Sequence, residues 1–408
     1  MESERKIKLR TNVLNNMDLS KHLSDDDILG LIDSVILKES IEQYIELKEK
    51  SELRWELFNS LRRLDVLQEL VDDEKITEIM INGAYNIFVE KAGRIYRYEK
   101  CFDSEERLLD VIQQIVSGAN RIVNESSPIV DVRLMDGSRV NVVLPPVALD
   151  GAIVTIRKFP EKPIDIDALI AIGSLTDEAA LMLKDLVESR YNIFISGGTG
   201  SGKTTFLNAL SNFIPGDERI ITIEDSAELQ IRNIPNIVRL ESKNANLEGK
   251  NMIQIRDLIK SALRMRPDRI IVGEVRDAAA IDVLTAMNTG HDGSLSTGHA
   301  NSPQDMLSRL ETMFLMGMEL PLGAVRKQIC SAVDILVHLG RLRDKSRRVL
   351  EIDEVVNMKD GEIVLNPLFC FEEEGESEEG KVLGCLKRTK YALVHTEKLR
   401  RAGKQKKT

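Results

Sequence analysis

The spacing of apolar residues divides the chain into three parts, and the first part, residues 1–65, is predicted to be helical. Apolar side chains recur there in steps of three and four among many charged ones, as at Leu53, Leu57 and Leu61. This spacing places them on one side of a helix. A turn is expected over residues 19–27, where Ser24 followed by Asp27 predicts the start of the next helix. Such charged helices usually face solvent, although this segment is also a candidate for docking a partner.

The second part, residues 66–160, changes to the alternating pattern that is typical of strands. A helical stripe over residues 108–116 interrupts this pattern, and Asp136-Gly137 is a residue pair favoured in tight hairpins. We therefore expect a compact α+β domain. Its predicted strands cover residues 76–81, 86–90, 94–98, 129–134, 139–144 and 153–157.

A linker over residues 161–174, which contains Pro163 and Gly173, is predicted to precede the third part, residues 175–408. In the third part apolar runs alternate with helical stretches, which indicates a mainly parallel sheet of the α/β class. An acidic loop is expected over residues 372–379, and the basic tail over residues 398–408 is expected to be mobile. The predicted strands cover residues 191–195, 220–223, 269–272, 335–339, 349–356 and 362–365.

The third part contains the phosphate-binding motif G-x-x-x-x-G-K-[ST] between a predicted strand and a predicted helix, which is the context that the motif requires. Its glycines let the backbone wrap a phosphate, and the helix N-terminus faces the anion. Lys203 is expected to reach the β- and γ-phosphates, and the Thr204 hydroxyl to hold Mg²⁺. We therefore predict a site for ATP and Mg²⁺ rather than a chance glycine-rich turn. The motif and the residue after it are Gly197, Gly198, Thr199, Gly200, Ser201, Gly202, Lys203, Thr204 and Thr205.

Two later strands end in carboxylates. The first leads into Glu224 and Glu228, and the second leads into Glu274. Because the carboxyl ends of parallel strands lie at one edge of a sheet, these groups are expected to converge on the γ-phosphate. Gly273 stands where a Walker B aspartate usually lies, so Mg²⁺ would be held mainly by Thr204, the nucleotide and water, with Glu274 nearby. The structural alternative is that the carboxylates only cap helices.

Two of the five histidines, His291 and His299, lie in one stretch rich in Gly, Ser and Thr after the second of these strands. A lone histidine is usually structural, but this pair favours a sensor of nucleotide state. A metal site is the weaker alternative because no cysteine accompanies the two histidines. His338, at the edge of an apolar strand, is interpreted as structural.

Composition narrows the class of protein. The formal net charge of −10 and the aromatic content of 4% argue against a general nucleic-acid binder. The charged N-terminus has no apolar signal segment, and no apolar run is long enough to span a membrane. The four cysteines lie far apart without a C-x-x-C pair, which predicts reduced thiols in a cytoplasmic protein.

Four stretches of the third part together resemble the type II/type IV secretion ATPase superfamily. They are the P-loop and residues 223–229, 263–276 and 286–303, which match the family's Walker A motif, Asp box, atypical Walker B motif and His box in this order. Gly273 is part of that family's own pattern. Residues 77–83, 126–128, 136–141 and 156–159 are similar to the CpaF-like branch, the Flp/Tad pilus-assembly ATPases. The resemblance extends over residues 60–370 or thereabouts.

The resemblance implies a Mg²⁺-dependent, hexameric ATPase of α/β class. Its RecA-like P-loop domain would follow an α+β domain and an N-terminal helical segment, with nucleotide between the two domains. Arg139 and Arg157 match the family arginines that approach the γ-phosphate, where a guanidinium stabilises developing charge.

The same resemblance implies roles for side chains of the P-loop domain. Glu274, together with Glu224 or Glu228, would position or activate the attacking water. His291 and His299 would couple the state of the nucleotide to movement of the domains.

As partners, the resemblance implies a homo-hexamer and an inner-membrane platform protein, which would hold this cytoplasmic protein at the inner face of the membrane. The motor would then power pilus assembly or secretion. Alternatives are a type IV secretion ATPase for DNA or effector transfer, a nucleotide-gated scaffold with little hydrolysis, and a RecA-like nucleic-acid motor. Two departures from the family pattern stand out. Gly298 replaces a larger apolar residue, which predicts a more flexible His box, and the tetracysteine zinc motif of many type II secretion ATPases is absent.

Overall fold

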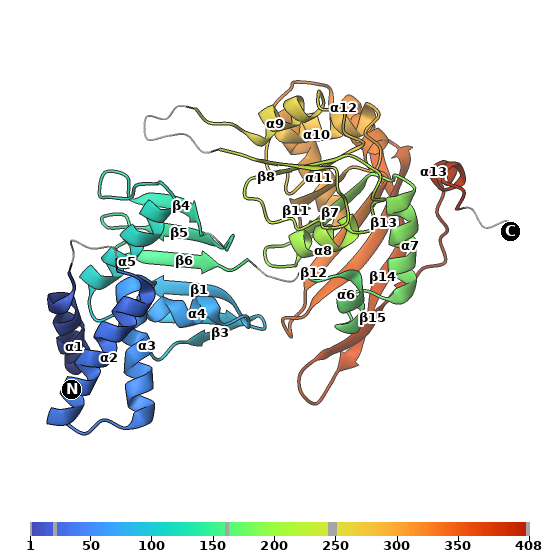
Figure 1. Ribbon diagram of the computed structural model, residues 1–408. Helices are drawn as coiled ribbons and strands as arrows, with labels where there is room; N and C mark the ends of the chain where they lie inside the picture. Colours follow the sequence, from blue (N-terminus) through green and yellow to red (C-terminus); the bar gives the residue numbers. More distant parts are fainter. Residues whose placement is uncertain (1, 19–22, 135, 160–162, 244–250, 405–408) are drawn as a thin grey trace. The chain divides into compact units, whose positions relative to one another are not determined.

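The computed structural model describes residues 2–18, 23–134, 136–159, 163–243 and 251–404. The chain divides into two compact units, Met1–Glu161 and Lys162–Thr408 (Figure 1). Each hydrophobic core cluster lies within one unit. Among the described residues no helix combines the length and the apolar character needed to cross a membrane.

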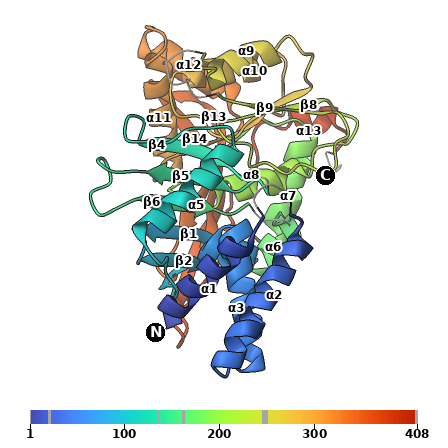
Figure 2. The same ribbon diagram turned by 60° about the vertical axis from the view of Figure 1, so that its left-hand side comes forward.

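The first unit begins with three helices that lie side by side, α1 (Glu2–Asn16), α2 (Asp25–Glu42) and α3 (Leu47–Arg62) (Figures 1 and 2). The predicted start of α2 is confirmed, because the Ser24 N–H donates to Asp27 Oδ2 at 2.8 Å and the Asp27 N–H donates to Ser24 Oγ at 3.2 Å. Part of the turn predicted before it lies outside the described residues.

A six-stranded antiparallel sheet completes the first unit, in the order β3-β2-β1-β6-β5-β4. One face carries apolar residues such as Val140 and Ile156 and packs with the apolar stripe of helix α5. The other face carries apolar residues such as Met80 as well as polar ones such as Asn141 and Thr155. The remaining elements of this unit are η1 (Asp65–Leu67), α4 (Gln68–Asp72), β1 (Ile76–Asn82), β2 (Ile87–Lys91), β3 (Arg94–Arg97), α5 (Glu105–Gly118), β4 (Ile129–Arg133), β5 (Arg139–Val143) and β6 (Ile153–Arg157).

The second unit is built on a nine-stranded sheet in the order β15-β14-β13-β12-β7-β11-β10-β8-β9. The strands from β12 to β9 in this order are parallel, and β13, β14 and β15 extend the sheet as an antiparallel meander. The strands are β7 (Ile193–Gly197), β8 (Ile220–Glu224), β9 (Ile237–Glu241), β10 (Arg269–Val272), β11 (Leu295–His299), β12 (Ile335–Arg341), β13 (Arg347–Lys359), β14 (Glu362–Glu376) and β15 (Val382–Arg388).

Helices cover both faces of this sheet, which confirms the predicted α/β class. Helices α6, α7 and α8 pack on one face, and α9 to α12 pack on the other (Figure 1). The helices are α6 (Ile166–Ala171), α7 (Asp177–Glu188), α8 (Lys203–Ser211), α9 (Ile255–Ala262), α10 (Ala279–Asn288), α11 (Pro303–Leu315), α12 (Leu322–Ala332) and α13 (Glu397–Arg401).

Three stretches differ from the prediction. Helix α6 lies within the interval that was expected to be a linker. The predicted acidic loop is wrong up to Glu376, because β14 continues to that residue and cross-strand cations such as Arg343 and Lys387 pair with its carboxylates. The basic tail is described up to residue 404. It forms α13, and Lys404 Nζ lies 2.7 Å from Asp185 Oδ1, while residues 405–408 lie outside the described residues.

Candidate nucleotide site

The P-loop connects β7 to α8 and depends on three glycines. Gly200 and Gly202 have φ angles of +71° and +94°, a left-handed conformation that side chains disfavour. Gly197 is needed for a different reason, since a Cβ there would lie 2.4 Å from the Leu339 carbonyl oxygen of β12. The backbone therefore turns sharply beside the neighbouring strand and enters α8 at Lys203.

Lys203 and His299 meet at the carboxyl end of the sheet. The register of β7 and β11 places His299 opposite Gly197. The Lys203 ammonium donates to the carbonyl oxygens of Gly197 at 3.0 Å and Gly198 at 2.9 Å. It also lies 3.2 Å from His299 Nδ1. The structure thus brings the predicted Walker A lysine and one histidine of the His box into direct contact.

Glu274 continues this line of polar contacts beyond β10. His299 Nε2 lies 2.8 Å from Glu274 Oε1. Arg276 Nη2 donates to Glu274 Oε2 at 2.7 Å, and Arg276 Nη1 lies 3.7 Å from Asp225 Oδ2. A cavity of about 160 Å³ lies beside Glu274, Arg276 and Asp225. One line of contacts therefore connects the P-loop, the His box, the Walker B strand and the Asp box.

The protonation states are consistent with these contacts. Burial, more than the nearby positive charges, lowers the pKa of His299 although Glu274 acts in the opposite direction. His299 is then neutral at pH 7, so its Nδ1 can accept from Lys203 while Nε2 faces Glu274 Oε1. Burial acts to raise the pKa of Glu274, but the hydrogen bond from Arg276 and the charges of Arg276, His299 and Lys203 outweigh it and lower this pKa. Glu274 is therefore ionised at neutral pH.

Glu224, at the end of β8, is buried and holds the Asp box. Its Oε2 accepts the N–H groups of Glu228 at 2.7 Å and Leu229 at 2.9 Å. A Cβ at Gly273 would lie 3.0 Å from Glu224 Cγ, so the glycine leaves room for this side chain. Glu228 is half-buried on the loop that Glu224 holds.

The remaining P-loop side chains lie on the loop or at the first turn of α8. Thr199 is exposed, and Ser201 is buried with its Oγ donating to the Gly198 carbonyl at 2.8 Å. Thr204 and Thr205 are half-buried at the start of α8. Within the described ranges no group of three His, Cys, Asp or Glu side chains is arranged to hold a metal ion.

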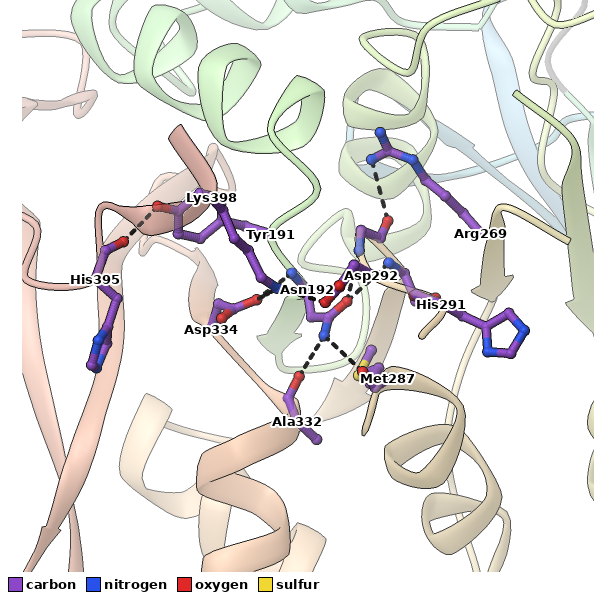
Figure 3. A network of polar contacts seen from close by, with 12 residues as sticks. Tyr191, Asn192, Arg269, Met287, His291, Asp292, Ala332, Asp334, His395 and Lys398 are labelled. Atoms are coloured by element: carbon purple, nitrogen blue, oxygen red, sulfur yellow. Dashed lines mark hydrogen bonds and ion pairs between the residues drawn. The ribbon is translucent and has the colours of Figure 1, made fainter. Parts of the chain in front are cut away.

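His291 lies away from this cluster, before the amino end of β11, whereas His299 is the last residue of that strand. Its Nδ1 lies 3.3 Å from the Ala286 carbonyl oxygen. Around it, Asn192 accepts the Gly293 N–H at 2.8 Å and donates to the Ala332 carbonyl at 2.8 Å (Figure 3). The structure does not bring His291 to the P-loop, because the full length of β11 separates the two histidines.

The C-terminal segment lies at the amino end of the parallel strands, the end where His291 lies. Lys398 Nζ lies 2.9 Å from Asp292 Oδ1 and 2.7 Å from Asp334 Oδ2, and the Tyr191 hydroxyl donates to the His395 carbonyl at 2.5 Å (Figure 3). Burial raises the pKa of Asp334, although Lys398 acts in the opposite direction. This ion-paired segment is thus anchored to the starts of β7 and β12.

Gly298 lies inside β11 rather than in a flexible loop, so the expected flexibility of the His box is wrong at this position. A Cβ there would lie 2.8 Å from Met306 Cε and 3.0 Å from Phe194 Cε1. The volume of the larger apolar residue expected at this position is occupied by the side chain of Met306.

Arg139 and Arg157 belong to the first unit, where they lie opposite each other on β5 and β6. They line a cavity of about 340 Å³ together with Glu78, Asp131, Asn141 and Thr155. Each has a carboxylate nearby, because Arg139 Nη2 lies 3.9 Å from Asp131 Oδ1 and Arg157 lies opposite Glu78 on β1, so this face carries both signs of charge. Burial raises the pKa of Glu78, against the effect of Arg157.

The sequence predicted no role for Arg276, which lies within the Walker B stretch and forms an ion pair with Glu274. Its position two residues after Glu274 was the available signal. Two further contacts were not predicted. Arg347 Nε donates to the carbonyl oxygen of Gly200, and Ser196 Oγ makes a buried contact of 2.9 Å with His338 Nδ1.

Most of the chain is similar to proteins of one family. A family model described as "Type II/IV secretion system protein" matches residues 61–397. A putative conjugal transfer protein of Mycobacterium tuberculosis is 36% identical over 293 residues, covering 70% of this chain and 83% of that protein. The type IV secretion system protein VirB11 of Bartonella henselae is 30% identical, covering 70% of this chain and 90% of that protein.

Among solved structures, the ATPase DotB of Yersinia pseudotuberculosis has a similar fold. The TM-score is 0.54 at 21% sequence identity, and the match covers 72% of this chain and 78% of that one.

Proposed function

Because the chain belongs to the type II/IV secretion system protein family, we propose that it is an ATP-hydrolysing motor. In this proposal it works as a hexameric ring and drives pilus assembly or protein secretion through an inner-membrane platform protein. The observation that carries the proposal is the line of contacts from Lys203 through His299 to Glu274. It joins the phosphate-binding lysine to an ionised carboxylate, the two groups that hydrolysis of a phosphoanhydride requires at one place.

The proposed roles follow from these contacts. The P-loop N–H groups and Lys203 bind the phosphates, and Thr204 holds Mg²⁺ together with the nucleotide and water. Glu274 orients the attacking water through an ionised oxygen. Its lowered pKa makes it a weak base, so it acts by orientation more than by removing a proton in advance. Glu224 supports the site by holding the Asp box, and Glu228 is the second candidate for contact with water.

We assign to Arg139 and Arg157 the stabilisation of charge on the transferred phosphoryl group. Two observations support this role, namely the motifs that they match and their direct opposition on one sheet face. For His291, whose place in the second unit is away from the P-loop, we propose only the coupling of domain movement and no contact with nucleotide.

For the biological system, the stretches around Thr77–Gly83 and Asp136–Asn141 favour the Flp/Tad pilus-assembly branch. A second candidate is a type IV secretion ATPase for DNA or effector transfer, because the relatives include conjugal transfer proteins and VirB11. Neighbouring genes for pilin and a platform protein, or for conjugation, would separate these candidates. In both cases the protein would be cytoplasmic and held at the inner face of the membrane by its partners.

We propose that the connection between α2 and α3 contacts a partner protein such as the inner-membrane platform protein. Ile41, Tyr44 and Leu47 are 86%, 84% and 85% exposed there, which is unusual for three large apolar side chains at one place. Replacing all three by serine should leave ATP turnover unchanged and lower pilus or secretion output in cells. Normal output from this variant would contradict a docking role for this connection.

The test of the motor function is ATP turnover per protomer measured against protein concentration, with Mg²⁺. Turnover should rise with concentration as the ring assembles. Lys203→Ala and Glu274→Gln should lower kcat by about 100-fold or more, and the Glu274 variant should still bind ATP. Arg157→Ala should lower kcat similarly.

Arg97 provides a control because it lies on β3, at the edge of the same sheet and three strands away from β6. Arg97→Ala should retain turnover. Full activity in the Lys203 or Glu274 variant would overturn the proposal, and tight ATP binding without turnover in the wild type would favour the nucleotide-gated scaffold instead.

A further inference from the structure

The hairpin between β12 and β13 brings an arginine to the outer side of the P-loop. Strand β12 runs beside β7, with Leu339 opposite Gly197. The chain then turns, and Arg347 at the start of β13 donates from Nε to the carbonyl oxygen of Gly200 at 2.8 Å. No motif considered above includes this residue, and it is 147 positions away from the glycine that it contacts.

The position of this hairpin is set by contacts other than the one to the P-loop. On β13 the Val349 N–H donates to the Ser174 carbonyl at 2.9 Å, and the Ser174 hydroxyl donates to the Arg347 carbonyl. At the turn, Arg343 lies 2.7 Å from Glu373 and 2.9 Å from Glu376. The hairpin is therefore a fixed support from which the Arg347 side chain reaches the loop.

The hairpin also brings two like charges together. Arg341 and Arg347 are directly opposite each other across β12 and β13, and both are exposed. Like charges in this position destabilise a sheet. Two guanidinium groups beside a phosphate-binding loop are, however, favourable as soon as a polyphosphate enters it.

The orientation of the Gly200–Ser201 peptide shows how the hydrogen bond from Arg347 affects the P-loop. In a trans peptide the C=O of Gly200 and the N–H of Ser201 point in opposite directions. Arg347 holds the carbonyl, so the N–H is turned to the inner side of the loop. There the Ser201 N–H points to the Gly198 carbonyl oxygen at 3.3 Å, the same oxygen that the Lys203 ammonium contacts at 2.9 Å. The Ser201 N–H and the Lys203 ammonium thus point to the same carbonyl oxygen on the inner side of the loop.

We infer that Arg347 is a positioning residue for nucleotide binding, because it fixes the Gly200–Ser201 peptide with its N–H toward the phosphates. The inference rests on the proposed function, since it requires the P-loop to bind the polyphosphate of a nucleoside di- or triphosphate. Arg347 acts through the loop and is not itself proposed to touch the reacting atoms.

The test compares three substitutions of Arg347 in the full chain by titration with a fluorescent ADP analogue and by steady-state ATP turnover. Arg347→Ala removes both the donor and the charge. Arg347→Gln keeps an N–H donor at the same bond distance from the backbone as Nε but removes the charge. Arg347→Lys keeps the charge and moves the donor farther out.

We expect Arg347→Ala to weaken ADP binding by about tenfold, which corresponds to about 1.4 kcal/mol. KM for ATP should rise by a similar factor while kcat at saturation changes much less. Arg347→Gln should restore most of the affinity, because the hydrogen bond and not the charge orients the peptide.

The neighbouring Arg348 is a matched control. It donates to the carbonyl groups of Ile172 and Gly173. Arg348→Ala removes the same charge from the same hairpin without touching the P-loop, so its ADP affinity should stay within about twofold of the wild type.

Each other result overturns the inference. Unchanged ADP affinity in Arg347→Ala would show that the contact has no role in binding, and an equal loss in Arg348→Ala would assign the effect to the hairpin as a whole. Rescue by lysine but not by glutamine would assign it to charge. If the wild type binds no ADP, the proposed function fails as well, which distinguishes that failure from the failure of Arg347 alone.

Discussion

Asp353 provides the sharpest test of the energetics in the second unit. It lies on β13 with only 2% of its surface exposed, and its Oδ2 has no hydrogen-bond partner within the part of the chain that the structure describes. Burial, followed by the charge of Glu351, raises the pKa of Asp353 from 3.8 to about 7. The folded protein therefore prefers the protonated carboxyl, and ionisation of this group opposes folding.

The magnitude follows from the two pKa values. A difference of about three units corresponds to about 4 kcal/mol of lost stability once the pH is well above 7. Asp353 binds its proton more tightly in the folded protein than in the unfolded protein, so ionisation of this group lowers the free energy of unfolding. The loss is absent below the unfolded pKa, grows as pH rises through the window from 3.8 to about 7, and is then constant. At pH 5 it amounts to about 1.6 kcal/mol.

The substitution Asp353→Asn keeps the shape of the protonated side chain and removes the ionisation. We expect it to stabilise the protein by up to about 4 kcal/mol at pH 8 and by less than about 2 kcal/mol at pH 5. The measurement is the urea-denaturation midpoint of both proteins at the two pH values. Glu372→Gln is the control, because this exposed carboxylate on β14 pairs with Lys387 at the surface and should show no such pH-dependent gain. A gain from Asp353→Asn that is equal at both pH values, or a loss at pH 8, would refute the reasoning.

Three further predictions concern other parts of the chain. ATP turnover should fall as pH drops below the ordinary histidine value of 6.5, because burial lowers the pKa of His299 and protonation would place a hydrogen on Nδ1 facing Lys203; a pH–rate profile without an acid limb would contradict this. Asn192→Leu should lower stability in urea by at least about 2 kcal/mol, because the buried N–H groups of Gly293 and Ser294 lose their acceptor. Ser24→Ala should cost about 1 kcal/mol through loss of the α2 cap, measured in the same way, and an unchanged urea midpoint would argue against the capping contact.

The strands that alternate clearly and the P-loop between strand and helix were predictable from the sequence, because period and glycine spacing are local properties. Strand β11 was not, since its Ser296 and Thr297 look like loop residues. Their hydroxyls donate to the carbonyl groups of Val272, the last residue of β10, and of Gly273 directly after it, at 3.1 and 2.7 Å, and this lets polar residues occupy the centre of a sheet.

Because β11 was not predicted, the sequence also led to a wrong picture of the two histidines at the candidate site. Without β11, His291 and His299 were read as one cluster, although a strand separates them. Arg347 could not be found from spacing at all, because its contact with Gly200 depends on how β12 and β13 pair beside β7. Local patterns thus singled out the candidate site residues, and the sheet order showed which of them meet.

Gly273 and Glu224 share one small volume. A Cβ at position 273 would lie 3.0 Å from Glu224 Cγ, so a larger residue there requires the Glu224 side chain to shift. Because Glu224 accepts the two hydrogen bonds that hold the Asp box, a side chain at position 273 would act on the Asp box through Glu224. Substitutions at the two positions should therefore be coupled in their effect on ATP turnover.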